Sequence, residues 1–498
     1  MRELKTTSTV SAEYSDVNLL YQNKLIGPSE LNKKFTWMYG TAKSSFPLQM
    51  LTEGNGAIKS LTPKELDGDT QYTWRTFGRQ VRSSRCVGLV NTSLTKPGLG
   101  ASTFEVIFED ALFHTLYSLY SPDGQSYVRV EGEGVRIGDK RVKYRLQLMT
   151  GDRNAYISPD NFLAGKSWSL GGTIIPMSKS DGTTANALVP GMWTNQFSAW
   201  RYSFPIAGNI ANKSVIYELD MIDENGTKTG TTNMWIPFQM KLWEIERREF
   251  IETKLWEDEY NRTPEGIILN IDPETGEYIP QGAGVKSQIK AIGNYTTYGE
   301  NLTLSFIDKT ILSVLGNRND QVPGELVFHT GKGGARMINN AIRKDAVLNQ
   351  YFTPLGAEVI KSGNGGLSYG AYFTQYKTID GWIVTLKTSD YFDQSTKARQ
   401  DIDNGRTFEG LPYYSYNIVS LDHSMRDDGE RNIQLVCEKG REYQANVYKG
   451  MSALPGSWGS IPGNLISTKK DIASYEVLGT SGVAMTNPTT SFWLEFVR

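Results

Sequence analysis

The chain has 498 residues, of which 39% are hydrophobic and 21% are charged. Its 49 glycines and 19 prolines follow no short period, which excludes a collagen-like or low-complexity protein. The 52 basic and 54 acidic residues leave a net charge of −2, so bulk electrostatics do not call for nucleic acid or an anionic membrane as the main partner. The length suggests about two to four compact units.

The cysteines and the N-terminal sequence indicate where the chain is made. Cys86 and Cys437 are far apart, a usage typical of a reducing compartment, although the sequence leaves a disulfide open. The first residues lack the apolar core of a signal peptide, and no run of about 18 apolar residues could cross a bilayer. We therefore expect synthesis in the cytoplasm and no membrane partner.

The first half of the chain changes character twice. Residues 1 to about 45 are polar, which predicts an extended arm that becomes ordered against a neighbour. From about 46 to 175 apolar and polar residues alternate, which predicts antiparallel β-structure, with strands at 103–108, 127–130 and 143–148. Clusters of Gly, Ser, Thr and Asn between about 176 and 230 indicate long surface loops.

The clearest helix is expected from about Met234 to Tyr260, with Pro237 in its first turn. Its apolar residues fall on two sides, so we expect two buried faces. Near one stripe are Ile236, Met240, Trp243, Phe250 and Ile251, and off it are Leu242, Trp256 and Tyr260.

The second half alternates short strands with helices, which predicts a compact α/β unit. We expect helices at 302–315 and 334–348, and strands at 325–329, 382–386, 416–421 and 432–436.

No local pattern predicts a catalytic or binding site. The four residues Gly331–Gly334 follow a strand and open a helix, so their amides are a candidate anion cradle. They lack the spacing of a Walker loop, and a flexible helix start is the preferred interpretation. The three histidines, His114, His329 and His423, are too far apart in sequence to indicate a metal site.

Two further motifs are incomplete. Asp401, Asp403 and Asn404 resemble the first half of a calcium loop, but Pro412 stands where a bidentate glutamate is needed, which leaves a polar loop. No serine stands in a Gly-x-Ser-x-Gly elbow. We therefore predict no catalytic residue, no cofactor and no metal site.

Seven segments spread along the chain carry a resemblance. They are YTWRTFGR (72–79), the helix 235–260, NRTPEG (261–266), QGAG (281–284), FHTGKGGARM (328–337), YFTQYKTIDGW (372–382) and SYNIVSLD (415–422). Taken in this order, they resemble a major capsid protein of tailed bacteriophages, of the crAss-like phage group. The resemblance covers most of the chain.

The resemblance implies an α+β protein with the Hong Kong 97-type capsid fold. Such a fold has an N-terminal arm, an extended β loop, a peripheral domain with a long spine helix, and an axial α/β domain. Because the β-rich region exceeds a two-stranded loop, we expect an inserted subdomain in it. The implied parts are 1–45 (arm), 46–175 (extended loop region and inserted subdomain), 176–300 (loops, spine helix and peripheral domain), 301–440 (axial domain) and 441–498 (return to the peripheral domain).

The resemblance also implies a function. It indicates a capsid subunit rather than an enzyme, which self-assembles into hexamers and pentamers of an icosahedral phage head around double-stranded DNA. Its location would be the virion, after assembly in the cytoplasm of the bacterial host. The implied partners are further copies of the chain, portal and auxiliary or decoration capsid proteins, and packaged DNA held by weak non-specific contact.

We expect subunit contacts at three places: Met1–Asn32, the region Tyr72–Arg85, and the charged flanks of the long helix. The candidate interface residues are Arg79, Arg82, Arg85, Arg247, Arg248 and Lys254.

Two other classes of protein stay open. A fibre, tail or other receptor-binding virion protein would share the β content, but the sequence shows neither coiled-coil nor repeat signals. A polysaccharide-active enzyme would need two carboxylates facing each other in a cleft, with a perturbed pKa.

Overall fold

The computed structural model divides into two compact units. The β-rich unit is Arg75–Met192, and the body unit comprises Met1–Trp74 and Trp193–Arg498. The expected arm at 1–45 lies outside the described residues. The structure describes residues 47–48, 64–67, 70–77, 81–138, 141–179, 182–183, 186–187, 189–207, 214–222, 228–315, 325–348, 375–378, 382–423, 431–448 and 472–498.

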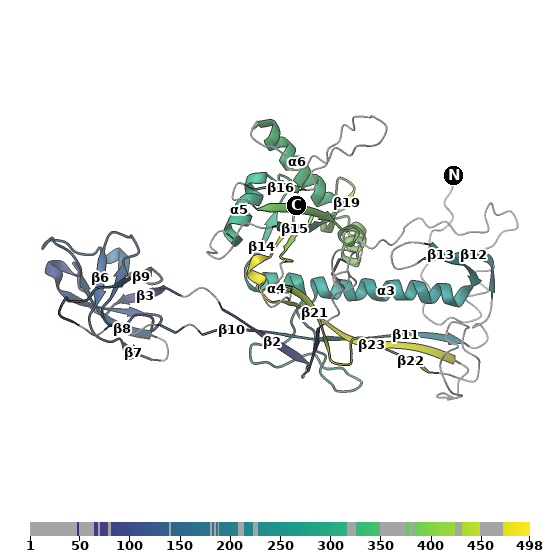
Figure 1. Ribbon diagram of the computed structural model, residues 1–498, viewed down its shortest axis with the longest axis horizontal. Coiled ribbons are helices and arrows are strands. Elements are labelled where there is room, and N and C mark those ends of the chain that lie inside the picture. Colours follow the sequence, from purple (N-terminus) through teal and green to yellow (C-terminus); the bar gives the residue numbers. More distant parts are fainter. Residues whose placement is uncertain are drawn as a thin grey trace. The chain divides into compact units, whose positions relative to one another are not determined.

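The β-rich unit is an antiparallel sheet that closes on itself (Figure 1). Its strand order is β4-β3-β9-β5-β6-β8-β7, and β4 also pairs with β8. Alternate side chains of β8 are buried, as expected of a strand with one face on a core and one in water. The elements are β3 (Ser83–Leu89), η2 (Leu99–Ala101), β4 (Thr103–Phe108), β5 (Tyr117–Tyr120), β6 (Tyr127–Val130), β7 (Val135–Ile137), β8 (Arg141–Leu148), η3 (Pro159–Phe162) and β9 (Ser167–Thr173).

Aromatic side chains fill the core of the β-rich unit. Phe108 is fully buried, and its ring lies edge-on to Phe113, Tyr144 and Trp168 at centroid distances of 5.1, 5.9 and 6.3 Å. Such pairs add about 0.5–1.5 kcal/mol each beyond the burial of their area. The buried residues of this core all come from Cys86 to Trp168, so the unit has a hydrophobic interior of its own.

The first sheet of the body unit lies along the long helix α3 (Figure 1). β23 pairs with β11, β21 and β22, and β1 joins β21 in parallel. Trp243 of α3 packs on Phe204 of β11 and Tyr475 of β23, with ring centroids 5.7 and 5.9 Å apart. The elements are β1 (Lys64–Leu66), β11 (Ser198–Ala207), α3 (Trp235–Glu257), β21 (Ile433–Glu438), β22 (Gln444–Tyr448) and β23 (Ile472–Met485).

The second sheet of the body unit is mixed and has the order β14-β24-β20-β15-β17-β16. The strands are β14 (Tyr295–Tyr298), β15 (Glu325–Thr330), β16 (Gln375–Lys377), β17 (Ile383–Thr388), β20 (Ile418–Leu421) and β24 (Phe492–Phe496).

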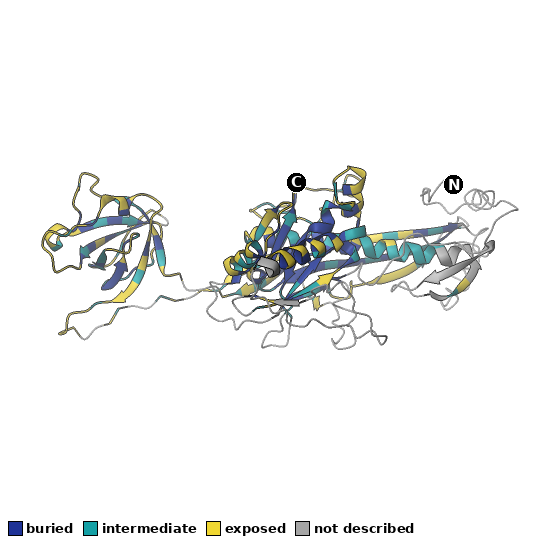
Figure 2. Ribbon diagram, turned by 90° about the horizontal axis from the view of Figure 1, so that it is seen from above, coloured by how far each residue is buried: buried dark blue, intermediate teal, exposed yellow. Residues whose placement is uncertain are grey.

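Helices pack against both faces of this second sheet. The buried residues gather in the interior, between helices and sheets (Figure 2). Along β24, Phe492 and Leu494 join one core with α5 and α6, whereas Trp493 joins the other core with α4, α7 and the end of α3. None of the described helices is long and apolar enough to span a bilayer. The bounds are α4 (Val285–Ala291), α5 (Leu304–Leu315), α6 (Lys332–Leu348), α7 (Asp390–Gln394) and α8 (Thr396–Asp403).

Smaller elements complete the two units. Three strand pairs are β2 (Gln71–Thr76) with β10 (Gly191–Gln196), β12 (Ser214–Ile222) with β13 (Lys228–Met234), and β18 (Thr407–Phe408) with β19 (Leu411–Pro412). Among its described residues, the body unit has two short 3₁₀ turns, η4 (Tyr413–Tyr416) and η6 (Pro488–Thr490).

Leu48 is anchored in the body unit. Its side chain is buried in the core that contains Trp256. Its backbone N–H donates to the carboxylate of Glu252 at 2.7 Å, and the same oxygen accepts from the Trp256 indole at 2.9 Å. A buried carboxylate needs such donors, because an unpaired one would be strongly destabilising.

Most elements predicted from the sequence are confirmed. The helices expected at 234–260, 302–315 and 334–348 are α3, α5 and α6, and the expected strands are β4, β6, β8, β15, β17, β20 and β21.

The long surface loops predicted at 176–230 are wrong for much of that range. Residues 191–196, 198–207, 214–222 and 228–234 form β10 to β13. In β11 the aromatic side chains at even positions, Trp200, Tyr202 and Phe204, face the core while Arg201 and Ser203 are exposed. This period of two was a readable strand signal, but the partner strand β23 lies more than 260 residues further on in the register Ser198↔Ser481.

We predict that Phe108→Ala loosens the β-rich unit alone, because its core is self-contained. The cavity should cost about 3–5 kcal/mol of local stability. Hydrogen exchange measured by mass spectrometry should show faster exchange in peptides from β4, β6 and β8 and unchanged exchange in α3 and β24. Leu163→Ala, at a side chain that is 56% exposed, is the control and should leave all peptides unchanged. Faster exchange throughout the body unit would contradict the prediction.

Candidate functional site

The predicted interface residues at the start of the β-rich unit are on its surface. Arg82 and Arg85 are exposed, and neither guanidinium has an ion-pair partner among the described residues. Their backbone carbonyls take part in the sheet: Arg82 O accepts from the Leu170 N–H, and Arg85 O accepts from the Glu109 N–H. Arg79 lies outside the described residues.

The predicted interface residues on α3 are partly buried. The Arg247 guanidinium lies over the rings of Trp200 and Tyr443, at 5.4 and 5.2 Å from their centroids, and burial lowers its pKa. Burial raises the pKa of the Asp258 carboxyl, and the nearby charge of Lys254 partly offsets that rise. Arg248 is likewise half-buried. The role of all three in subunit contact stays a prediction.

The amides of the candidate anion cradle are occupied by the protein itself. The N–H of Lys332 donates to Asp393 Oδ1 at 3.0 Å, and that of Gly333 donates to Ser415 Oγ at 2.8 Å. A carboxylate of the chain thus caps α6, in the place an external anion would take. The glycines permit close approach, because a Cβ at Gly334 would meet Thr330 Oγ1 at 1.9 Å.

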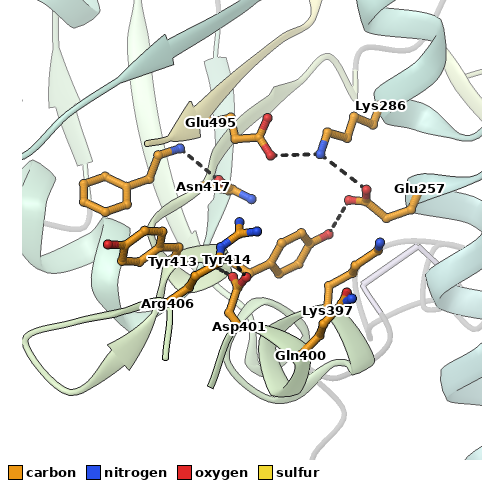
Figure 3. A pocket seen from close by; sticks show the side chains of 11 residues that line it. Glu257, Lys286, Lys397, Gln400, Asp401, Arg406, Tyr413, Tyr414, Asn417 and Glu495 are labelled. Atoms are coloured by element: carbon orange, nitrogen blue, oxygen red, sulfur yellow. Dashed lines mark hydrogen bonds and ion pairs between the residues drawn. The ribbon is translucent and has the colours of Figure 1, made fainter. Parts of the chain in front are cut away.

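A polar cavity of about 190 Å³ lies where the end of α3 meets α4, α8 and β24 (Figure 3). Three acidic and three basic side chains line it together with two tyrosines and two amides. The lining residues are Glu257, Lys286, Lys397, Gln400, Asp401, Arg406, Tyr413, Tyr414, Asn417, Glu495 and Phe496.

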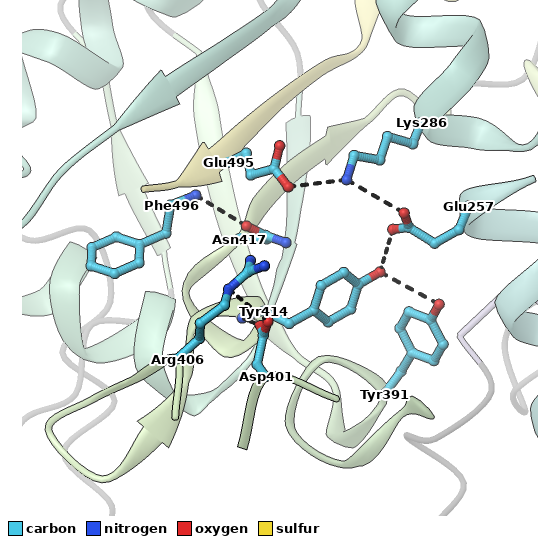
Figure 4. A network of polar contacts seen from close by, with 9 residues as sticks. All are labelled: Glu257, Lys286, Tyr391, Asp401, Arg406, Tyr414, Asn417, Glu495 and Phe496. Atoms are coloured by element: carbon cyan, nitrogen blue, oxygen red, sulfur yellow. Dashed lines mark hydrogen bonds and ion pairs between the residues drawn. The ribbon is translucent and has the colours of Figure 1, made fainter. Parts of the chain in front are cut away.

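Lys286 joins two carboxylates across this cavity (Figure 4). Its ammonium lies 3.4 Å from Glu257 Oε2 and 3.1 Å from Glu495 Oε1, and 5.3 Å from the centre of the Trp493 ring. The Tyr414 hydroxyl donates to the other oxygen of Glu257 at 2.7 Å. Burial raises the pKa of Tyr414, so this phenol stays a neutral donor.

Asp401 holds the other side of the cavity together (Figure 4). Its carboxylate accepts from the Tyr414 backbone N–H at 2.8 Å and from the Arg406 guanidinium at 3.1 Å. Asp401 and Asp403 are in α8 rather than in the polar loop expected there. The Asp401 carboxylate thus serves as an internal hydrogen-bond acceptor.

The carboxylates of the cavity are therefore ion-paired within the chain. A glycosidase-like pair would need one carboxyl kept protonated opposite a free carboxylate. Burial does raise the pKa of Asp258 to about 6, but Asp258 does not line the cavity. The arrangement joins secondary-structure elements and sets each carboxylate against a cation, whereas the enzyme hypothesis needs two carboxyls that face each other.

The fold brings together two histidines that are far apart in sequence. His329 Nε2 lies 2.8 Å from His423 Nε2, so one neutral ring donates to the other. His329 is buried beside Trp256, and its Nδ1 has no hydrogen-bond partner in the described part of the chain. Burial lowers the pKa of both rings, to about 4 for His423. No group of three metal-ligating side chains occurs among the described residues.

Sequence reasoning missed these polar pairs for a physical reason. Lys286 is 29 positions from Glu257 and 209 from Glu495, and the two histidines are 94 positions apart. No spacing rule connects residues at such separations.

The chain was compared with solved structures and with curated protein sequences. Several solved structures of shell proteins match at low similarity, and no curated protein sequence matches the chain. The encapsulin complex holo-SrpI from Synechococcus elongatus PCC 7942 is 11% identical over 63% of this chain and 77% of that one, with a TM-score of 0.30. A structure of Mycobacterium phage Patience is 8% identical over 66% of this chain and 78% of that one, with a TM-score of 0.33. A structure of Mycobacterium phage Bobi is 7% identical over 66% of this chain and 82% of that one, with a TM-score of 0.32. These structural scores carry no conclusion.

The sequence, rather than the structural similarity, identifies the family of the chain. A family model described as Crassvirus major capsid protein matches residues 12–497. This match defines the class as a viral capsid protein, a structural component of a bacteriophage virion. The chain belongs to the crassvirus major capsid protein family. The predicted resemblance to crAss-like phage capsid proteins is confirmed.

We predict that Lys286→Met destabilises the body unit, because it leaves the Glu257 and Glu495 carboxylates without the ammonium that separates them. The expected loss is roughly 1.5–3 kcal/mol, measured by chemical denaturation of the unassembled subunit. Adding Glu495→Gln should recover part of it, because one uncompensated charge is removed. Lys397→Met is the control: it lines the same cavity but has no ion-pair partner among the described residues, so its effect should stay within about 0.5 kcal/mol.

We also predict that the histidine pair makes the body unit acid-sensitive. Both folded pKa values lie below the usual 6.5, so below that pH the unfolded chain binds protons that the folded chain does not. The free energy of unfolding should therefore fall as pH drops from about 6.5 toward 4, by up to roughly 1.4 kcal/mol per pH unit and group.

The measurement for the histidine pair is denaturant unfolding at a series of pH values. His423→Gln keeps a polar side chain but removes one titrating ring, so the slope between pH 6.5 and 4 should become flatter. His114→Gln, in the β-rich unit, controls for loss of an imidazole elsewhere. An unchanged slope in His423→Gln would show that the pair does not cause the acid sensitivity.

Proposed function

We propose that this capsid protein assembles into hexamers and pentamers of an icosahedral head that encloses double-stranded DNA. The observation that carries the proposal is the family match over residues 12–497, nearly the full sequence. A shell with closed symmetry needs many copies of one chain, and the repetition of modest contacts stabilises it. The proposed role is structural rather than catalytic.

We further propose the Hong Kong 97-type arrangement within the subunit. Helix α3 would be the spine, and the sheet containing β23 would belong with it to the peripheral domain. The second sheet with α5 and α6 would form the axial domain. In this proposal the β-rich unit, which is inserted between β2 and β10, would be the extended loop region with its inserted subdomain. The pairing of β23 with β11 supports a C-terminal return to the peripheral domain.

The proposed partners follow from the same function. They are further copies of the chain, portal and decoration proteins, and packaged DNA held weakly. A net charge of −2 supports weak DNA contact, since strong binding to phosphates requires many basic contacts. Assembly would take place in the cytoplasm of the host.

The test is electron microscopy of the purified chain as its concentration is raised. We expect rings or closed shells, because the proposed contacts are between identical copies. Removing residues 1–32, the part of the expected arm (1–45) predicted to make subunit contacts, should leave a folded subunit with a lower particle yield. A chain that stays monomeric and forms no particles, alone or with the proposed portal and decoration proteins, would contradict the proposal. An unchanged yield after the deletion would contradict the arm assignment only.

A further inference from the structure

The segment between α3 and α4 exposes an unusual number of large apolar side chains. We call residues 261–281 the 261–281 hairpin. Exposed on it are Ile267 (55%), Leu269 (73%), Ile271 (52%), Tyr278 (62%) and Ile279 (48%). Single exposed apolar residues are common, but five on one short excursion indicate a surface that is covered in use.

The tip of the 261–281 hairpin is ordered by its own hydrogen bonds. Asp272 accepts from the backbone N–H and the hydroxyl of Thr275 at 3.0 and 2.7 Å. Its backbone N–H donates to the Glu277 carbonyl at 2.8 Å, and Gly276 takes the left-handed conformation at φ 72° that closes the turn. The apolar side chains are therefore held in place before any partner arrives.

The base of the 261–281 hairpin is fixed to the body unit. Asn261 donates to the Ile279 carbonyl at 2.7 Å and accepts from Gln281 N–H at 3.0 Å. The Arg262 guanidinium donates to Gln196 Oε1 at 2.7 Å, to Gly266 O at 3.0 Å and to Thr70 Oγ1 at 3.0 Å. The only cation of the hairpin is thus used internally.

The exposed apolar side chains of the 261–281 hairpin point in defined directions. Ile271 and Tyr278 are bridged in antiparallel register, so their side chains lie next to each other on one face. Ile267 and Leu269 flank Ile268, which is buried, and therefore point away from the body unit. A rigid element with an outward apolar face loses little conformational entropy when it docks.

Charge indicates what covers the 261–281 hairpin. It carries Arg262 and four carboxylates, Glu265, Asp272, Glu274 and Glu277, a net charge of −3. Residues 75–192 carry 14 basic and 10 acidic side chains, net +4, whereas the rest of the chain carries 38 and 44, net −6. Opposite charge on two surfaces of one chain favours pairing between copies.

The β-rich unit also offers matching apolar surface. Every residue of β7 is exposed, with Val135 at 57% and Ile137 at 42%, and Arg136 lies between them. β7 pairs with β8 on one side only, so its other edge is unpaired in the described chain. An apolar edge strand with a basic residue suits an acidic, apolar hairpin.

We propose that the 261–281 hairpin docks on the basic β-rich unit of a second copy of this chain. The inference rests on the proposed function and deepens it, because it names which two surfaces meet. Apolar contact supplies the burial, and the carboxylates of the hairpin face the basic side chains of the neighbouring copy.

Site-specific cross-linking of assembled particles tests the inference. Both native thiols are buried, and burial raises their pKa to about 11, so a new exposed thiol is the one that reacts near neutral pH. Leu269→Cys, labelled with a thiol-reactive photo-cross-linker, should give covalent dimers whose cross-linked peptides map to residues 75–192. Leu312→Cys on α5, 52% exposed, is the matched control and should not cross-link to that unit. Cross-links within one chain, to another region, to an accessory protein or to nothing would each overturn the inference.

A charge variant separates this inference from the proposed function. Leu269→Asp should raise the concentration for half-maximal assembly about tenfold or more. Leu312→Asp should leave it near that of the parent chain. If the parent assembles and Leu269→Asp assembles equally well, the docking inference fails while the proposed function stands. If the parent does not assemble under any condition, the proposed function itself fails.

Discussion

The body unit depends on the burial of strands from the end of the chain in both of its sheets. β23 is flanked by β11, β21 and β22, and β24 lies between β14 and β20. Within β24, alternate residues enter two different cores, with Trp493 on one side and Phe492, Leu494 and Phe496 on the other. Neither core can close without these two strands, since each would lose central side chains and a ladder of backbone hydrogen bonds.

The polar network at the end of α3 follows from that arrangement. Once β24 is seated, Glu495 lies beside Lys286, which in turn reaches Glu257. Such a cluster contributes specificity more than raw stability, because partly buried charges lose hydration when they pair. It fixes α3, α4, α8 and the second sheet in one relative position. The outward surfaces, including the 261–281 hairpin, are thereby presented in a constant geometry.

Local signals in the sequence account for most of the helices and strands, and long-range pairing accounts for what was missed. The period of 3.6 predicts α3, and the alternation of apolar and polar residues predicts β4, β6 and β8. The glycine and serine clusters around β11 favour a loop, although the aromatic alternation within β11 is a strand signal. The capsid family could be recognised from segments such as 328–337, but Lys286, Asp393 and the histidine pair have partners set only by the folded topology. Arg247, predicted to contact another subunit, lies over the Trp200 ring of its own chain, a contact that its sequence position does not indicate.

The position of β23 and β24 in the gene product has a consequence during translation. All strands of the β-rich unit have left the ribosome once residue 173 has emerged, so this unit can fold on the nascent chain. The body unit must wait for residue 496. A nascent chain that ends before residue 496 therefore has an unfinished body unit, and a subunit becomes competent to join a growing particle only after β24 has emerged.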